Sequence, residues 1–267
     1  MDASLWIGFV SIVALIGWAV LKAGFTVSST DVYGVILVLG GLVTSMMVNC
    51  SFHDLSSAFK RFASLFFRSR SPSVESAIEQ ITVLSRKAQK EGGILALQSE
   101  NIDFADGFLK RAILVAVSTG ESAETRRVME THIRRVRLER QEDANTFRTM
   151  AVLSPMFGLL GTLLGMVRVL QSMSDPMKAA AGMALALSSA FLGIAIANAV
   201  CVPIAGKIRL NALKETMILD LLLEGVLDIV AGKPPYLIEL HLSSYAERTG
   251  EAAHSATAPV APARGTP

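Results

Sequence analysis

The segment Met150–Val167, with the sequence MAVLSPMFGLLGTLLGMV, carries no charged residue and decides the fold. Three other segments have the same character: Leu5–Leu21, Val32–Cys50 and Ala179–Gly206. Each is close to the ~20 residues that a helix needs to cross the hydrocarbon core of a bilayer, and soluble core helices seldom run so far without a charge. The sequence therefore predicts an all-α integral membrane protein with four transmembrane helices, whose even number leaves both termini on one side.

The distribution of charge orients these helices. The chain is 51% hydrophobic and 18% charged, with a mean hydropathy of +0.47, which is too apolar for an ordinary soluble domain. Of the 25 Lys and Arg residues, 16 lie between residues 51 and 149 and 6 lie from Lys207 onward. Because basic residues remain on the cytoplasmic side of a membrane, we expect the middle segment and both termini in the cytoplasm.

The pattern between the apolar segments predicts further helices. No Gly or Pro interrupts Met46–Arg70, so we expect the second transmembrane helix to continue into the cytoplasm, and residues 121–154 predict one long helix that enters the third. A similar extension from Lys207 to Val230 should end at Gly232 and Pro234. The expected organisation is two transmembrane helices (1–50), a cytoplasmic helical domain (51–149), two transmembrane helices (150–206), a cytoplasmic helical extension (207–248) and a disordered tail (249–267).

Small residues and prolines mark the last two transmembrane helices. Helical spacing places Pro155, Gly158, Thr162 and Gly165 on one face of the third, and Gly182, Ala186, Ala190, Gly193 and Ala197 on one face of the fourth. Such faces let helices approach closely, so we expect them to meet other helices and not lipid. Pro155 and Pro203 each free a backbone carbonyl that protein or water must satisfy, which predicts a polar seam.

The composition of the seam excludes several functions. None of the four apolar segments holds an acidic residue or a histidine, so a proton path would need a carboxylate from another chain. The sequence has no nucleophile and base arrangement, metal motif or phosphate loop, so we expect no enzyme, no cofactor and no nucleic-acid partner. Cys50 and Cys201 lack a partner at metal-ligand spacing and are interpreted as packing residues.

Five motifs resemble one family. They are Leu153–Gly165 (LSPMFGLLGTLLG), Met183–Leu187 (MALAL), Ala197–Ala205 (ANAVCVPIA), Glu91–Leu97 (EGGILAL) and Lys233–Glu239 (KPPYLIE). Taken in their order along the chain, over roughly residues 1 to 245, they resemble the MotA/PomA flagellar stator subunits. The resemblance implies a protein of the bacterial inner membrane that forms a homopentameric ring around a MotB-type, peptidoglycan-anchored partner. Ion passage past an Asp of that partner would turn the ring against the rotor switch protein of the flagellar C-ring.

The resemblance also implies roles for single residues. Pro155 and Pro203 match the functional prolines of the family, and Thr162 matches a threonine that faces the ion path. Sodium-driven members carry a second threonine where this chain has Ala190, which favours protons, because sodium needs hard oxygen ligands. Ser188 and Ser189 keep sodium as the alternative. The expected ion pathway and partner-helix interface comprises Pro155, Gly158, Thr162, Gly165, Ala186, Ala190, Gly193 and Pro203.

The rotor surface matches less completely. The family places a basic residue shortly before the Gly pair and an acidic residue eight positions later, and here Lys90 fits while Gln98 takes the acidic position. The expected rotor interface is Lys90, Glu91, Glu100 and Asp103. Two alternatives remain at this point: an ExbB/TolQ-like energiser of outer-membrane processes, which usually has three transmembrane helices, and a structural membrane scaffold.

Overall fold

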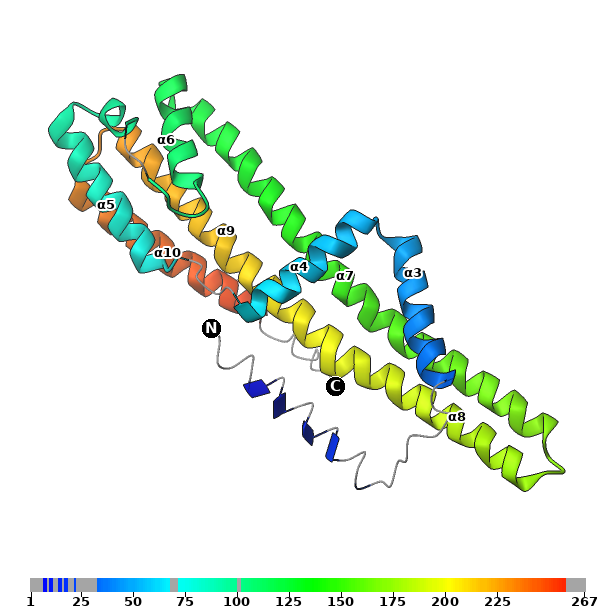
Figure 1. Ribbon diagram of the computed structural model, residues 1–267. Helices are drawn as coiled ribbons and strands as arrows, with labels where there is room; N and C mark the ends of the chain where they lie inside the picture. Colours follow the sequence, from blue (N-terminus) through cyan, green and yellow to red (C-terminus); the bar gives the residue numbers. More distant parts are fainter. Residues whose placement is uncertain are drawn as a thin grey trace, which may run out of the picture. The chain divides into compact units, whose positions relative to one another are not determined.

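The computed structural model describes residues 33–67, 72–99 and 102–257, together with isolated positions between 7 and 22. Every regular element within these residues is helical (Figure 1), which confirms the predicted all-α class. The elements are η1 (Ile36–Gly40), α3 (Gly41–Asn49), α4 (Phe52–Phe67), α5 (Val74–Glu91), η2 (Ile94–Leu97), α6 (Phe108–Thr119), α7 (Ser122–Gln171), α8 (Pro176–Ala195), η3 (Ile196–Cys201), α9 (Val202–Val230) and α10 (Pro235–Thr257).

Two of these helices are long and apolar enough to cross a membrane. They are Ser122–Gln171 and the continuous run Pro176–Val230. A bent pair, Tyr33–Asn49 with Phe52–Lys60, is apolar enough to provide a third crossing if its two parts form one span. The fourth expected segment, Leu5–Leu21, lies outside the described residues apart from isolated positions. The single long helix that was expected to lead from the cytoplasm into the third crossing is confirmed as α7.

The expectation of one helix through Met46–Arg70 is wrong. α3 ends at Asn49, Cys50 is extended (φ −123°, ψ 148°), and the next helical segment turns by 117°. The cause is local: the Ser51 hydroxyl oxygen accepts a hydrogen bond from the His53 N–H at 3.4 Å, and the Ser51 N–H donates to the Asp54 carboxylate at 3.2 Å. This reciprocal cap begins a new helix without any Gly or Pro.

The chain forms two compact units, which we describe separately. Unit 1 comprises residues 1–69 and 139–210, and unit 2 comprises residues 70–138 and 211–267. In unit 1, α4 packs on α7 and α9 through a small core of Ala58, Phe147, Ile204 and Ile208. The Phe147 ring lies 6.0 Å from Phe62 and 6.1 Å from Phe59, as measured between ring centroids.

Unit 2 has the larger apolar core. Its part of α9 is buried nearly all round, and Leu221, Leu222 and Val226 are fully enclosed by α5, α6, α7 and α10. A glycine allows the close approach of α5, because a Cβ atom at Gly225 would lie 2.7 Å from Ile81 Cγ2. The apolar periodicity of the helices of unit 2 therefore produces one core, in which α9 is central.

The C-terminal region agrees with the sequence-based prediction except at its tail. As predicted, α9 ends at Val230 before Gly232, whose φ of +69° suits glycine, and Pro235 starts α10. The expected disordered tail from residue 249 is wrong in part, because α10 continues to Thr257. The added turns contain Glu251, Ala252 and Ala253, which favour helix. Residues 258–267 lie outside the described residues.

Candidate functional site

The small-residue faces of α7 and α8 meet each other. A Cβ atom placed on Gly158 would lie 3.0 Å from the Ser189 carbonyl oxygen and 3.4 Å from the Ala190 and Gly193 Cα atoms. One placed on Gly165 would lie 2.7 Å from the Ala186 Cβ atom and from the Gly182 carbonyl oxygen. Any larger residue would push the helices apart. These contacts bring five of the predicted site residues together within one chain, namely Gly158, Gly165, Ala186, Ala190 and Gly193.

A buried hydroxyl, which sequence reasoning missed, fastens this helix pair. The Ser154 side chain is fully buried, and its Oγ donates to the Gly193 carbonyl oxygen at 2.9 Å. The partner is 39 residues away along the chain, so no spacing signal could reveal it. Hydroxyl donors of this kind hold membrane helices in register, because the hydrocarbon offers no competing water. Ser154 thus fixes α7 against α8 directly beside Pro155.

Ser188 and Ser189, the alternative sodium ligands, lie on the side of α8 that faces η1 and the residues before it. Ser189 is fully buried and its Oγ donates to the Leu185 carbonyl oxygen at 2.7 Å, and Ser188 makes the same type of bond at 3.3 Å. A Cβ atom at Gly34 would lie 2.8 Å from the Ser189 Oγ and 3.6 Å from the Ser188 Oγ. The Ser188 hydroxyl therefore lies near Gly34, and the Ser189 hydroxyl lies between Gly34 and Gly161 of α7, where a Cβ atom would be 2.6 Å from its Oγ. The donor protons of both serines are already engaged.

Thr162 occupies a different place. Its side chain is half-buried, and Oγ1 donates to the Leu159 carbonyl oxygen of its own helix at 2.6 Å. With the proton held by the backbone, the oxygen lone pairs remain available to accept from water. Pro155 is half-buried inside α7, and Pro203 is exposed near the start of α9. No hydrogen bond within the described residues joins Thr162 to α8.

A π-helical turn precedes the second proline. η3 spans Ile196–Cys201, between α8 and α9, and Pro203 follows two residues after its end. Proline cannot donate to the carbonyl four residues earlier, and its ring crowds that carbonyl, so the locally widened helix makes room for Pro203. The turn contains Asn198, whose amide Nδ2 donates to the Ile194 carbonyl oxygen at 3.2 Å while the side chain stays exposed.

The predicted rotor residues are exposed. Lys90 and Glu91 close α5, and the chain then turns through Gly92 (φ +91°) and Gly93 (φ +106°), conformations that strongly favour glycine. Asp103 is exposed in the connection before α6. Glu100 lies outside the described residues, so its position is not defined.

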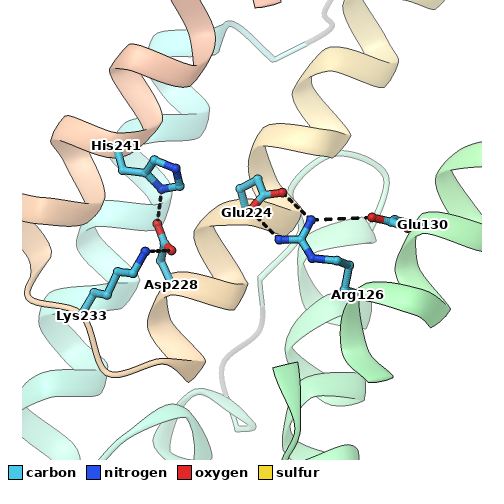
Figure 2. Close-up of polar contacts among 6 residues, drawn as sticks. All are labelled: Arg126, Glu130, Glu224, Asp228, Lys233 and His241. Carbon is cyan, nitrogen blue, oxygen red and sulfur yellow. Dashed lines mark hydrogen bonds and ion pairs between the residues drawn. The ribbon is translucent and has the colours of Figure 1, made fainter. Parts of the chain in front are cut away.

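Other charges of unit 2 are engaged in ion pairs that tie its helices together (Figure 2). Arg126 of α7 donates two hydrogen bonds to Glu224 of α9, at 2.6 and 2.9 Å, and lies 3.6 Å from Glu130. The hydrogen bonding of Arg126 to the Glu224 carboxylate is the main cause of the raised pKa of Arg126. One turn further along α9, the buried Asp228 carboxylate accepts from Lys233 Nζ at 2.7 Å and contacts His241 Nδ1 at 2.6 Å.

Comparison with known proteins agrees with this architecture. The model of the MotA/TolQ/ExbB proton channel family matches residues 100–221. Chemotaxis protein PomA of Vibrio alginolyticus is 28% identical over 245 residues, which cover 92% of this chain and 95% of PomA. Motility protein A of Bacillus subtilis is 26% identical, with 92% of this chain and 91% of the relative covered.

Solved structures agree on the fold. The structure of C. jejuni MotAB superposes with a TM-score of 0.81 at 22% identity, over 92% of this chain and 96% of the matched chain. The MotAB stator complex from Bacillus subtilis gives a TM-score of 0.82 at 21% identity. The resemblance read from the motifs is thereby confirmed. Over residues 100–221 the chain is similar to the MotA/TolQ/ExbB proton channel family.

Proposed function

We propose that this chain is a subunit of an ion-driven flagellar stator, which converts ion flow into torque on the rotor. One observation carries the proposal: the similarity to PomA and to Motility protein A spans nearly the whole of each chain. The closely packed α7–α8 pair adds support, because it places Thr162 on a helix held rigidly by glycine contacts and interrupted by Pro155. Such a pair can present a polar seam to another chain and bend at the proline.

The assembly that follows is a ring of identical subunits, a homopentamer, around a MotB-type partner anchored to peptidoglycan. The seam lacks an acid, so the partner's transmembrane helix supplies the carboxylate past which ions move. The chain lies in the bacterial inner membrane with both termini in the cytoplasm, as the basic residues in 51–149 and after Lys207 require. The outward contact is with the rotor switch protein, through Lys90, Glu91, Asp103 and Glu100.

The transported ion is the proton. Ala190 offers no oxygen, and the Ser188 hydroxyl lies near Gly34. The Ser189 hydroxyl is fully buried between Gly34 and Gly161, so neither serine replaces the missing ligand beside Thr162. A dehydrated sodium ion would then meet one hydroxyl of this chain, which is too few for a cation that takes several oxygen ligands. A proton needs only the partner's carboxylate and connected water.

Swimming assays test the proposal. Deletion of the gene should abolish swimming and its return on a plasmid should restore it, whereas an energiser of outer-membrane processes would leave swimming intact. Swimming should persist in sodium-free medium and stop with a protonophore. Thr162→Ala should slow it at normal membrane levels, while Ser188→Ala, the matched loss of a hydroxyl on the other side, should not. Speed that rises with external sodium at constant proton-motive force would overturn the proton assignment.

A further inference from the structure

Two stripes of side chains on the α7–α8 pair point away from the contact between these helices. The stripe on α8 and η3 contains Leu187 (65% exposed), Phe191 (45% exposed) and the exposed Asn198. The stripe on α7 contains Leu160 (43% exposed), Met156 (57% exposed) and the half-buried Thr149. In each stripe the residues are four and seven positions apart, which keeps them on one helical face.

The two stripes match in depth across the membrane. The hydrogen bond from Ser154 to the Gly193 carbonyl shows that these two residues lie at the same level. The helices run in opposite directions, and each residue advances ~1.5 Å along the axis. A residue n positions after Gly193 is therefore at nearly the same depth as the residue n positions before Ser154. On this count Leu187 is level with Leu160, Phe191 with Met156, and Asn198 with Thr149.

Depth matters because a ring has its symmetry axis along the membrane normal. Rotation about that axis moves a residue sideways and leaves its depth unchanged. Neighbours in a ring touch through two different surfaces of the same chain, so one stripe must meet the other. Apolar residues then meet apolar residues, with a Phe ring against a Met thioether, and the polar pair Asn198 and Thr149 meets at one level.

The polar pair Asn198 and Thr149 indicates that a second copy of this chain packs against the stripes. Asn198 lies within an apolar run, and only its Nδ2 has a partner among the described residues, on the Ile194 carbonyl. The Thr149 hydroxyl has no hydrogen bond within the same part of the chain. Thr149 directly precedes the apolar segment Met150–Val167, so this level lies at the membrane boundary. A second copy packed there would exclude water from the amide oxygen, and a protein donor at the same level would satisfy that oxygen.

We propose that the α8 stripe of one copy packs against the α7 stripe of the next, and that the Asn198 Oδ1 accepts a hydrogen bond from the Thr149 hydroxyl of that second copy. The inference rests on the proposed ring. It assigns the contact between subunits to the flank of the α7–α8 pair and leaves the face with Thr162 to the partner helix.

Disulfide cross-linking in membranes tests the contact, with the full chain expressed beside the gene for its partner. In a Cys50→Ser, Cys201→Ser background, Thr149→Cys combined with Asn198→Cys should give a ladder of multimers on oxidation. Met156→Cys with Phe191→Cys is a second, independent pair, should the first accumulate poorly. Each single variant, and Thr149→Cys with Ser188→Cys on the opposite side, should remain monomeric.

The outcomes separate the two proposals. An amine-reactive cross-linker applied to the same membranes reports assembly without regard to this contact. Multimers with that reagent but no ladder from either cysteine pair would overturn the contact and leave the ring intact. Monomers with both reagents would overturn the ring itself. Ladders from a single cysteine variant would indicate a symmetric contact and contradict the assigned pairing.

Discussion

Substitution of Gly193 by alanine tests the α7–α8 contact most directly. A Cβ atom at this position would lie 2.6 Å from the Ser154 carbonyl oxygen and 3.1 Å from the Gly158 Cα atom, whereas ordinary contacts begin at 3.4 Å. The helices would have to separate by about 0.8 Å at the first of these contacts. Both close neighbours are backbone atoms, so no side chain can turn aside to make room.

The magnitude follows from three contributions. Overpacking of this kind costs ~1–3 kcal/mol, and loss of the Ser154 hydrogen bond costs ~0.6 kcal/mol in a membrane. Alanine returns ~1 kcal/mol through its higher helix propensity. We expect Gly193→Ala to lower the free energy of unfolding by about 0.6–2.6 kcal/mol.

Gly206 is the matched control, because no atom lies within 4 Å of the position of its Cβ atom. Gly206→Ala should therefore raise the free energy of unfolding by up to ~1 kcal/mol, again from helix propensity. Denaturation of both purified variants in detergent, followed by helical circular dichroism, measures the difference. Equal stability of the two variants would refute the close approach of α7 and α8.

Three further predictions follow from single contacts. Pro155→Ala and Pro203→Ala should leave membrane levels normal but reduce swimming by about tenfold or more, because alanine restores the backbone donor and stiffens the helix; normal swimming in both would make the prolines incidental. Burial raises the pKa of the Asp143 carboxyl, and a hydrogen bond donated by Ser57 opposes part of this shift. The folded protein therefore loses stability as pH rises from the unfolded-state pKa of this group through its folded-state pKa. Relative to the unchanged chain, Asp143→Asn should then gain melting temperature as pH rises above about 4, and a relative loss would contradict this sign. Asp228→Asn should lower the free energy of unfolding by about 2 kcal/mol, because both contacts lose the negative charge of their acceptor and one of them loses its oxygen. A loss as small as that for an exposed acid would show that Asp228 does not hold the helices together.

The extent of the helices could be predicted because it depends on patterns within one segment. The apolar run of Met150–Val167 and the absence of Gly and Pro before it fix α7, and Gly232 with the following prolines fixes the end of α9. The bend after Asn49 was missed although a signal exists, since Ser51 and Asp54 have the spacing of a capping box. Apolar continuity suggested a helix there, and a local hydrogen bond decided otherwise.

The site was harder to predict because its contacts join distant parts of the chain. The small residues of α7 and α8 correctly indicated close helix packing, but a pattern on one helix does not say which neighbour it meets. Gly158 and Gly193 are used within the chain, so part of the surface expected for the partner helix is already occupied. The hydroxyls of Ser154 and Ser189 reach their carbonyls only in the folded structure.

The charges of unit 2 indicate which surface can work against a rotor. Arg126, Glu224 and Asp228 belong to partly buried pairs, and loss of one partner would leave a shielded charge unpaired, so these pairs hold the helices together. A sliding contact must form and break at every step, which suits exposed charges whose pairs contribute only ~0–1 kcal/mol. Lys90 and Asp103 are exposed in this way, whereas the Arg126 region of α7 is committed to α9. Reversal of Lys90 to Glu should accordingly reduce torque in a tethered-bead assay with no change in melting temperature, and a compensating reversal on the switch protein should restore part of it. Unchanged torque, or a melting temperature that falls with it, would show that Lys90 is not part of the rotor surface.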